Sequence, residues 1–165
     1  MPIAVIDIEH LRGHNGDMYS YSDQDSVASG AAINHALQTF EDETHLRFSF
    51  AAAQIATVSL IENAVLTGGT IDDARIFNRN RNCGKTAGAH VWDNALYTGG
   101  TVIFVEQRGA PTAAAQVAPF VYDGLPRAAT EWILMPNTLY ILRVVNNDNS
   151  TSTISTQMNW YEFSD

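Results

Sequence analysis

Charged residues are scarce in this chain. Asp, Glu, Lys and Arg make up 16% of its 165 residues, against about 25% in an ordinary soluble domain, and Lys85 is the single lysine. Two interpretations are open. The surface is the neutral polar exterior of a soluble β-protein, or much of it lies against other subunits, because interfaces are depleted in Lys, Glu and Asp.

Three further absences narrow the class of protein. There is no apolar run of about 18 residues, the length of a membrane-spanning helix, and MPIAVIDIEH at the start does not resemble a secretory signal. Cys83 is the only cysteine, so an internal disulfide is impossible and a reducing site of synthesis is expected. The net charge of −9 argues against nucleic-acid binding, which needs a basic face.

The sequence does contain short stretches in which apolar and polar residues alternate. Leu46, Phe48 and Phe50 alternate with polar residues, which is the period of a half-buried strand. Residues 101–108, TVIFVEQR, are apolar on both faces, as expected for a covered strand. Only residues 26–40, SVASGAAINHALQTF, offer a helical alternative.

Clusters of turn-forming residues separate these stretches at short, regular intervals. This pattern predicts an all-β fold, an antiparallel β-sandwich that is jelly-roll-like. We expect a short N-terminal arm or edge strand over residues 1–22 and the sandwich domain over residues 23–165.

One phrase occurs twice, as NAVLTGGTI at 63–71 and as NALYTGGTV at 94–102. Gly-Gly supplies the positive φ that tight hairpins need, so we interpret the phrase as one structural turn used twice. A nucleotide loop, GxxxxGK[ST] before a helix, is excluded, because Gly84-Lys85-Thr86 has Arg79 where the first glycine is required. Two copies are also too few for a stacked repeat.

Potential ligands gather in DIEHLRGHNGD, residues 7–17. On a helix, His10 and His14 would share a face and could hold a metal there. Gly13 and the Asn15-Gly16 turn favour an extended strand instead, which would hold the two imidazoles about 13 Å apart. We therefore predict a strand with a polar turn and no metal.

No catalytic constellation is recognisable. The acidic clusters Asp72-Asp73 and Glu41-Asp42-Glu43 lie in apparent turns, where solvated charge is expected, and GxSxG, HExxH and Ser/His/Asp patterns are missing. The prediction is a non-enzymatic protein without a cofactor.

Three arginines are candidate contact residues. Arg79 and Arg81 alternate with asparagines in NRNRN, residues 78–82. They could hold a carboxylate-rich partner through bidentate hydrogen bonds, or bond to carbonyls of their own turn. Arg143 interrupts an apolar stretch, and arginine is enriched at subunit contacts.

The order of several phrases along the chain resembles a family of small structural proteins of tailed bacteriophages. These phrases are IEHLRGHNGDMYSYSD, THLRFSF, LIENAVLTGGT followed by FNRNRN, the second TGGT, EWILMPNTLYILRVVNN and MNWYE. The chain matches the family pattern at Glu9-His10, at Asn78-Arg79-Asn80-Arg81 and at Trp160-Tyr161-Glu162. It departs from the pattern at Glu62-Asn63, where Glu-Gly is common, and at RGHNG, where a more acidic stretch is usual.

The resemblance implies a virion component, a head decoration or cement protein that binds the outer surface of the mature head and bridges capsid subunits. The implied partners are the major capsid protein and sister copies of the chain in a homotrimer, with no nucleic acid and no membrane. Synthesis would take place in the host cytoplasm. The candidate contact residues are Glu9, His10, His14, Arg79, Arg81 and Arg143.

A tail-associated receptor-binding or glycan-binding sandwich is the alternative. In that case an exposed Trp92, Trp132 or Trp160 would stack on sugars, although Trp132 and Trp160 have the pattern of core residues.

Overall fold

The computed structural model describes residues 8–109, 120–121 and 131–163. Within them the chain is mostly β-strand, with one short α-helix and one 3-10 turn. The elements in chain order are α1 (Ile8–Asn15), β1 (Met18–Val27), β2 (Ala32–Gln38), β3 (Glu43–Ala52), β4 (Ala56–Ile71), η1 (Asp73–Arg75), β5 (Phe77–Asn78), β6 (His90–Arg108), β7 (Phe120–Val121), β8 (Trp132–Leu134), β9 (Leu139–Asn146) and β10 (Ser152–Phe163).

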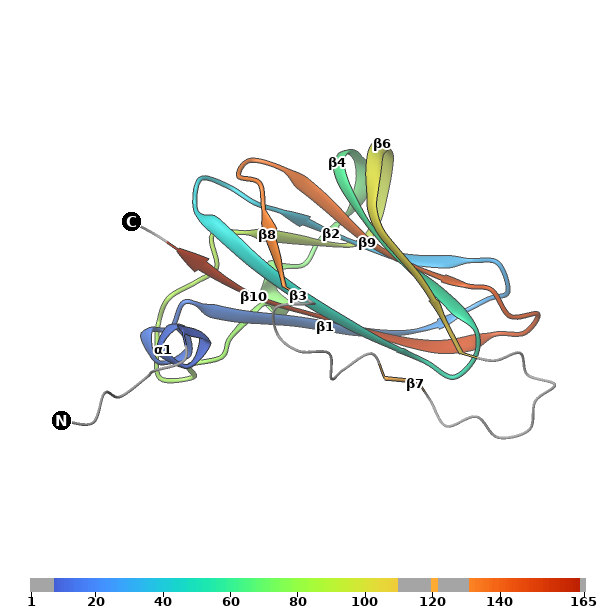
Figure 1. The fold of residues 1–165 in the computed structure, drawn as a ribbon, viewed down its shortest axis with the longest axis horizontal. Helices are drawn as coiled ribbons and strands as arrows, with labels where there is room; N and C mark the ends of the chain where they lie inside the picture. The colour runs from blue at the N-terminus through green and yellow to red at the C-terminus, as the bar shows by residue number, and fades with distance from the viewer. Residues whose placement is uncertain (1–7, 110–119, 122–130, 164–165) are drawn as a thin grey trace.

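The strands pair as successive parts of one long hairpin that has been rolled up. β1 pairs with β10, β2 with β9, β3 with β8 and β4 with β6, all antiparallel. The first sheet has the order β5-β1-β10-β3, with β7 and β8 beside β3, and the second sheet contains β2, β9, β4 and β6 (Figure 1). This is a jelly-roll order, so the predicted all-β, antiparallel, jelly-roll-like sandwich is confirmed.

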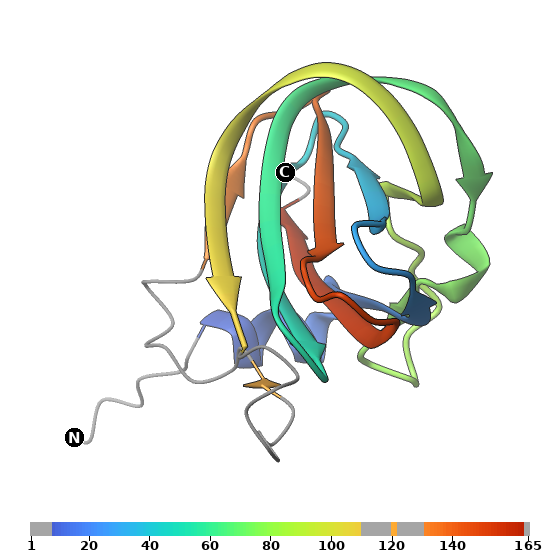
Figure 2. The same cartoon turned by 90° about the vertical axis from the view of Figure 1, so that its right-hand side faces the viewer.

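The second sheet curls until its edge strands meet. The start of β6 pairs with β2, from Trp92–Ala36 to His90–Gln38, and the rest of β6 pairs with β4, which closes a four-stranded barrel. Figure 2 shows β4 and β6 arching together over this barrel. Its interior is narrow and filled partly by small side chains, which lets the strands approach closely. The interior residues are Ala36, Ile61, Ala64, Ala95, Leu139 and Ile141.

The main core lies between the two sheets. Alternate residues of β10, such as Ile154, Met158 and Trp160, point inward and are at most 1% exposed, where they meet Leu60 and Leu142 of the second sheet. Full burial of one such side chain stabilises the fold by about 1.5–3 kcal/mol. The alternation of residues along such a strand in the sequence therefore identifies the side chains that form the core.

Most of the predicted strands are present, but several finer predictions fail. Residues 32–38 form β2, so the helical alternative for residues 26–40 is wrong. The covered strand predicted for 101–108 is wrong as well, because Val102 and Val105 are 56% and 63% exposed. A register shift between Leu60 and Ile61 marks a bulge, so that Val102 lies opposite Ile61 and Val105 opposite Ser59. Both valines therefore point away from Phe104 and the main core.

The strand predicted within residues 7–17 is also wrong, because α1 is a helix. The helix ends in a Schellman cap: Asp17 N–H donates to the Arg12 carbonyl at 3.0 Å and Gly16 N–H donates to the Gly13 carbonyl at 3.2 Å. Gly16 has a φ of 76°, the left-handed conformation that this cap requires. The Asn15-Gly16 pair, which suggested a turn instead of a helix, is the helix terminus itself.

The N-terminal arm is shorter than predicted. β1 begins at Met18 and pairs with β10 along its whole length, so the boundary between residues 22 and 23 falls inside a core strand. Of the predicted arm, residues 1–7 lie outside the described residues, and α1 is the described part that precedes the sandwich.

Candidate functional site

The two copies of the repeated phrase pair with each other. Leu66 lies opposite Tyr97, and these residues occupy the same position in the two copies, so a local two-fold relation is centred between them. Both Gly-Gly pairs lie inside β4 and β6. The prediction of two separate tight turns is therefore wrong.

Each Gly-Gly of one copy instead accommodates the Asn-Ala of the other. A Cβ atom at Gly69 would lie 3.0 Å from Ala95 Cα, and one at Gly100 would lie 3.2 Å from Ala64 Cα. The asparagine that opens each copy has a positive φ, 57° in the first copy and 49° in the second. The repeated phrase thus produces one backbone irregularity in β4 and an equivalent one in β6, and we call these two paired strands the ribbon. Glycine is needed at both places because the backbones approach closely.

This ribbon leaves apolar side chains exposed at equivalent positions of the two copies. Val65 and Leu96 are 63% and 61% exposed, and Ile71 and Val102 are 54% and 56% exposed. With Val105 they make up five of the ten large hydrophobic side chains that are exposed in the described part of the chain. We call Val65, Ile71, Leu96, Val102 and Val105 the ribbon row.

In the NRNRN segment, the asparagines and the arginines lie in different environments. Asn78 is buried, and its Nδ2 donates to the carbonyls of Gly16 at 2.7 Å and Lys85 at 3.1 Å. Asn80 Nδ2 donates to the His14 carbonyl at 2.8 Å. The asparagines therefore hold this loop against the C-terminal end of α1.

The two arginines of the segment point the other way. Arg79 and Arg81 are both exposed, and the Arg81 guanidinium lies 5.4 Å from the centre of the Phe77 ring. Among the residues that the structure describes, neither guanidinium makes a hydrogen bond or an ion pair. Bonding to carbonyls of their own turn, one of the two interpretations from the sequence, is not observed there.

The candidate residues of α1 lie at the same end of the molecule. His10 and His14 are exposed on one face of the helix, with their Nε2 atoms 3.0 Å apart, and Glu9 lies in the first turn. Because Asn80 bonds to the His14 carbonyl, the NRNRN loop is adjacent to this helix. The fold thus gathers five of the six candidate contact residues into one region, which we call the α1–loop face.

Arg143, the sixth candidate, lies elsewhere. It is half-buried on β9, on the strand face that carries the barrel residue Ile141. Its Nη1 donates to the Tyr97 hydroxyl at 3.3 Å. Arg143 is thus engaged with the ribbon of its own subunit.

The contacts of Glu162 give a structural reason for the Trp-Tyr-Glu match to the family pattern. Its carboxylate is buried and accepts hydrogen bonds from the N–H groups of Gly88 at 2.7 Å and Ala89 at 3.0 Å, and from Trp160 Nε1 at 2.9 Å. The Trp-Tyr-Glu end therefore anchors the segment before β6 to β10. This is a structural role rather than a contact surface.

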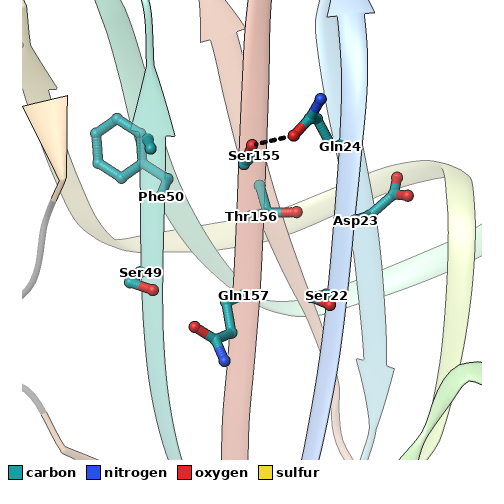
Figure 3. Close-up of a pocket in the computed structure, with 9 residues that line it drawn as sticks. Ser22, Asp23, Gln24, Ser49, Phe50, Ser155, Thr156 and Gln157 are labelled. Atoms are coloured by element: carbon teal, nitrogen blue, oxygen red, sulfur yellow. Dashed lines mark hydrogen bonds between the residues drawn. The ribbon is translucent and has the colours of Figure 1, made fainter. Parts of the chain in front are cut away.

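A shallow polar groove of about 450 Å³ crosses the outer face of the first sheet (Figure 3). Small hydroxyl and amide side chains of β1, β3 and β10 surround it, and Ser155 donates to Gln24 at 3.1 Å. The outward-facing polar residues are Ser22, Gln24, Ser49, Ser155 and Gln157. Phe50 also lines the groove but is only 2% exposed, so it offers no stacking surface.

The three tryptophans are not free for stacking on sugars. Trp160 is 0% exposed, as predicted for a core residue. Trp92 and Trp132 are half-buried, and each packs against one of the two apolar clusters.

A buried polar cluster that the sequence analysis missed lies where β1, β2 and β6 meet. His35 is 1% exposed; its Nδ1 is 3.3 Å from Asp93 Oδ1, and its Nε2 is 2.9 Å from Thr156 Oγ1 and 3.8 Å from Asp23 Oδ2. Burial lowers the pKa of His35, although Asp23 and Asp93 oppose this shift. No local spacing could reveal the cluster, because Asp23, His35, Asp93 and Thr156 come from four separate strands.

Arg75 occupies the other side of this cluster. Its Nη2 donates to Asp23 Oδ1 at 2.7 Å and to the Tyr21 hydroxyl at 2.9 Å, and its Nε lies 2.8 Å from Asp72 Oδ2. Burial raises the pKa of Tyr21, so the phenol stays protonated and can donate to Asp72. The carboxylate of Asp23 is therefore shared between Arg75 on one oxygen and His35 on the other.

Among the described residues, no helix is long and apolar enough to cross a membrane. No family model matches the chain, and no curated protein matches it either. Among solved structures, a chain of the infectious bursal disease virus Gx strain is 8% identical and has a TM-score of 0.16; the match covers 88% of this chain and 40% of that chain. A similarity of this size carries no argument about fold or function.

Proposed function

We propose that the chain is a non-enzymatic capsid decoration, or cement, protein of a tailed bacteriophage, which binds the outer surface of the mature head and stabilises it by bridging capsid subunits. The ribbon row is the observation that carries this proposal. Soluble proteins rarely expose extended apolar surface without a partner, and here such surface is built at equivalent positions of a repeated phrase.

The two exposed features suit two different partners. The ribbon row is apolar and uncharged, which is typical of contacts between permanently associated copies of one chain. We assign it to sister subunits, in a homotrimer. The α1–loop face offers two exposed guanidinium groups, Arg79 and Arg81, which suit the carboxylates of a separately folded partner. We assign this face to the major capsid protein.

Decoration of this kind needs no chemistry. A protein that binds the assembled shell but not free capsid subunits stabilises the shell by mass action. Many copies that each bridge neighbouring subunits make individually modest contacts collectively strong. The jelly roll by itself would support many functions, so the proposal depends on these surfaces and on the family resemblance.

Immunogold electron microscopy of intact virions with an antibody to this chain is the direct test. Gold over the head supports the decoration function. Gold confined to the tail would favour the receptor-binding alternative, and particles without label would contradict both.

A glycan-binding tail module is the second candidate, and the polar groove on the first sheet favours it. Hydroxyl and amide side chains can hydrogen-bond to sugars, but no exposed tryptophan is available beside them in the described structure. A glycan array with purified protein tests this candidate. Reproducible saccharide binding that is lost in Gln24→Ala/Gln157→Ala supports it, and an array without signal argues against it.

A further inference from the structure

We propose that Asp23, His35 and Asp93 form a binding site for one divalent transition-metal ion, with Zn²⁺ as the best fit. The sequence-based expectation of no metal considered only His10 and His14. The three residues proposed here lie on β1, β2 and β6, and neither the decoration function nor the resemblance involves them.

The geometry is close to that of a metal-ligand set. One potential ligand atom from each residue lies within 4.8 Å of the other two. Two ligands bound to one zinc ion at 2.0–2.2 Å can be at most about 4.4 Å apart, so small side-chain rotations are sufficient. One imidazole nitrogen with two carboxylates suits Zn²⁺ or Mn²⁺ better than Ca²⁺, which prefers oxygen ligands alone.

The unsatisfied nitrogen of His35 is a second, independent indication. Its Nδ1 is buried and has no hydrogen-bond partner among the described residues, since Asp93 Oδ1 at 3.3 Å lies outside hydrogen-bond geometry. Buried polar atoms are seldom left without a partner. Thr156 holds Nε2 at 2.9 Å, which orients the ring as outer-shell partners of metal-bound histidines do.

The charge balance of the site also favours a cation. The carboxylates of Asp23 and Asp93 lie beside His35, and Asp25 adds to the negative potential there. Apart from His35, the one basic side chain in contact with Asp23 or Asp93 in the described structure is Arg75, which pairs with Asp23 Oδ1 at 2.7 Å. Burial keeps the imidazole in its neutral form, which is the form that binds metals.

The location defines what a bound ion would do. Asp93 follows Trp92, the last of three β6 residues that pair with β2 to close the barrel. Asp23 lies opposite Thr156 in the first sheet (Figure 3). An ion bound here would join β2 and β6 of the second sheet to β1 of the first sheet. The Asp93 side chain is 24% exposed, so water can supply the remaining ligand on that side.

The test is calorimetric titration of the EDTA-treated full chain with ZnCl2. It is made in a His10→Ala/His14→Ala background, because those two exposed imidazoles could hold an ion by themselves. We expect one equivalent of Zn²⁺ to bind. Addition of Asp93→Asn should weaken binding at least 10-fold, as loss of a direct ligand does.

Asp73→Asn in the same background is the matched control. Asp73 also lies 2.6 Å from a histidine, His90, but on the surface and without a third ligand, so Zn²⁺ affinity should not change. Absence of binding in the background variant, or equal affinity in Asp93→Asn, would overturn the proposal.

A second measurement covers the case in which Asp93→Asn does not fold. In the His10→Ala/His14→Ala protein, substoichiometric Mn²⁺ should broaden the imidazole NMR signals of His35 before those of His45 and His90. Broadening of His90 or His45 first would contradict a site at His35.

Discussion

The two outer faces of the sandwich differ sharply, although both belong to antiparallel strands of one domain. On the first sheet, β1, β3 and β10 present serine and glutamine side chains around a shallow groove. On the barrel, the β4–β6 ribbon presents valine, leucine and isoleucine. The low content of charged residues therefore has two structural explanations. One face carries uncharged polar side chains that suit water, and the other carries apolar side chains that suit a partner.

The largest effect is expected at the centre of the ribbon. Gly100→Ala should destabilise the fold by about 3 kcal/mol, because φ is 90° and the new methyl group would lie 2.7 Å from Ile61 Cγ2. Gly99→Ala is the control: it shares a positive φ but has open space around it, so only about 1 kcal/mol should be lost. Urea unfolding measures both values, and equal losses would show that close packing of the two copies is unimportant.

The second-largest loss of stability is expected in the first sheet. Glu162→Gln should cost about 2 kcal/mol, because a charged acceptor of three N–H groups is replaced by an amide that also carries donors. Thermal unfolding gives this value. Glu41→Gln, at an exposed carboxylate between β2 and β3, is the matched substitution and should change stability by less than about 0.5 kcal/mol. Similar losses in the two variants would argue against Glu162 as an anchor.

The stability of the fold should depend on pH through His35, which lies where the two regions meet. The pKa of His35 is lowered in the fold from 6.5, so below that pH the unfolded chain binds more protons than the folded one. Stability should therefore fall as the pH decreases from 6.5, by at most about 1.4 kcal/mol per pH unit for one proton. Urea titrations in EDTA at several pH values measure this slope. His35→Gln should flatten it, and an unchanged slope would assign the dependence to other groups.

A small effect on stability should accompany a change in assembly. If the chain forms the proposed homotrimer, Val65→Ser/Leu96→Ser should shift it to a monomer while changing the stability of each subunit by only about 0.5 kcal/mol, because both side chains are exposed. Analytical ultracentrifugation gives the oligomeric state. Ser22→Ala/Ser155→Ala on the first sheet should leave that state unchanged. A trimer that persists in the ribbon variant would contradict the proposal that the two faces differ in function.

The α1–loop face provides the corresponding test for the capsid contact. Arg79→Ala/Arg81→Ala should weaken binding to mature heads at least 10-fold in co-sedimentation without lowering the melting temperature, because neither guanidinium is bonded within the described subunit. Arg79→Lys/Arg81→Lys keeps the charge and should retain more of the binding. A lower melting temperature in the alanine variant would instead indicate an internal role.

Much of the fold could be predicted because the relevant signal is local. The period of two in Leu46, Phe48 and Phe50 places these side chains on one face of a strand wherever that strand packs, and all three are buried. The candidate site was only partly predictable. The alternation of asparagine and arginine marks the NRNRN loop, but only the fold shows that its asparagines bond to α1.

Two of the errors, the strand predicted within residues 7–17 and the two tight turns predicted for the repeated phrase, share one cause. Asn-Gly and Gly-Gly permit a positive φ, and a positive φ occurs in hairpin turns, in helix caps and in strand irregularities alike. Gly16 caps α1, and Gly69 and Gly100 accommodate the opposite strand. The sequence indicates that the backbone bends at these positions, and long-range pairing selects the kind of bend.

The sequence by itself determined the all-β class, the inward face of most strands, the shortage of charge and the repetition of one phrase. Tertiary structure alone decided that the two copies pair with each other, that α1 is a helix next to the NRNRN loop, and that Asp23, His35 and Asp93 meet. The physical reason is that alternation and turn chemistry act over a few residues. Strand register instead depends on packing between segments that are distant along the chain.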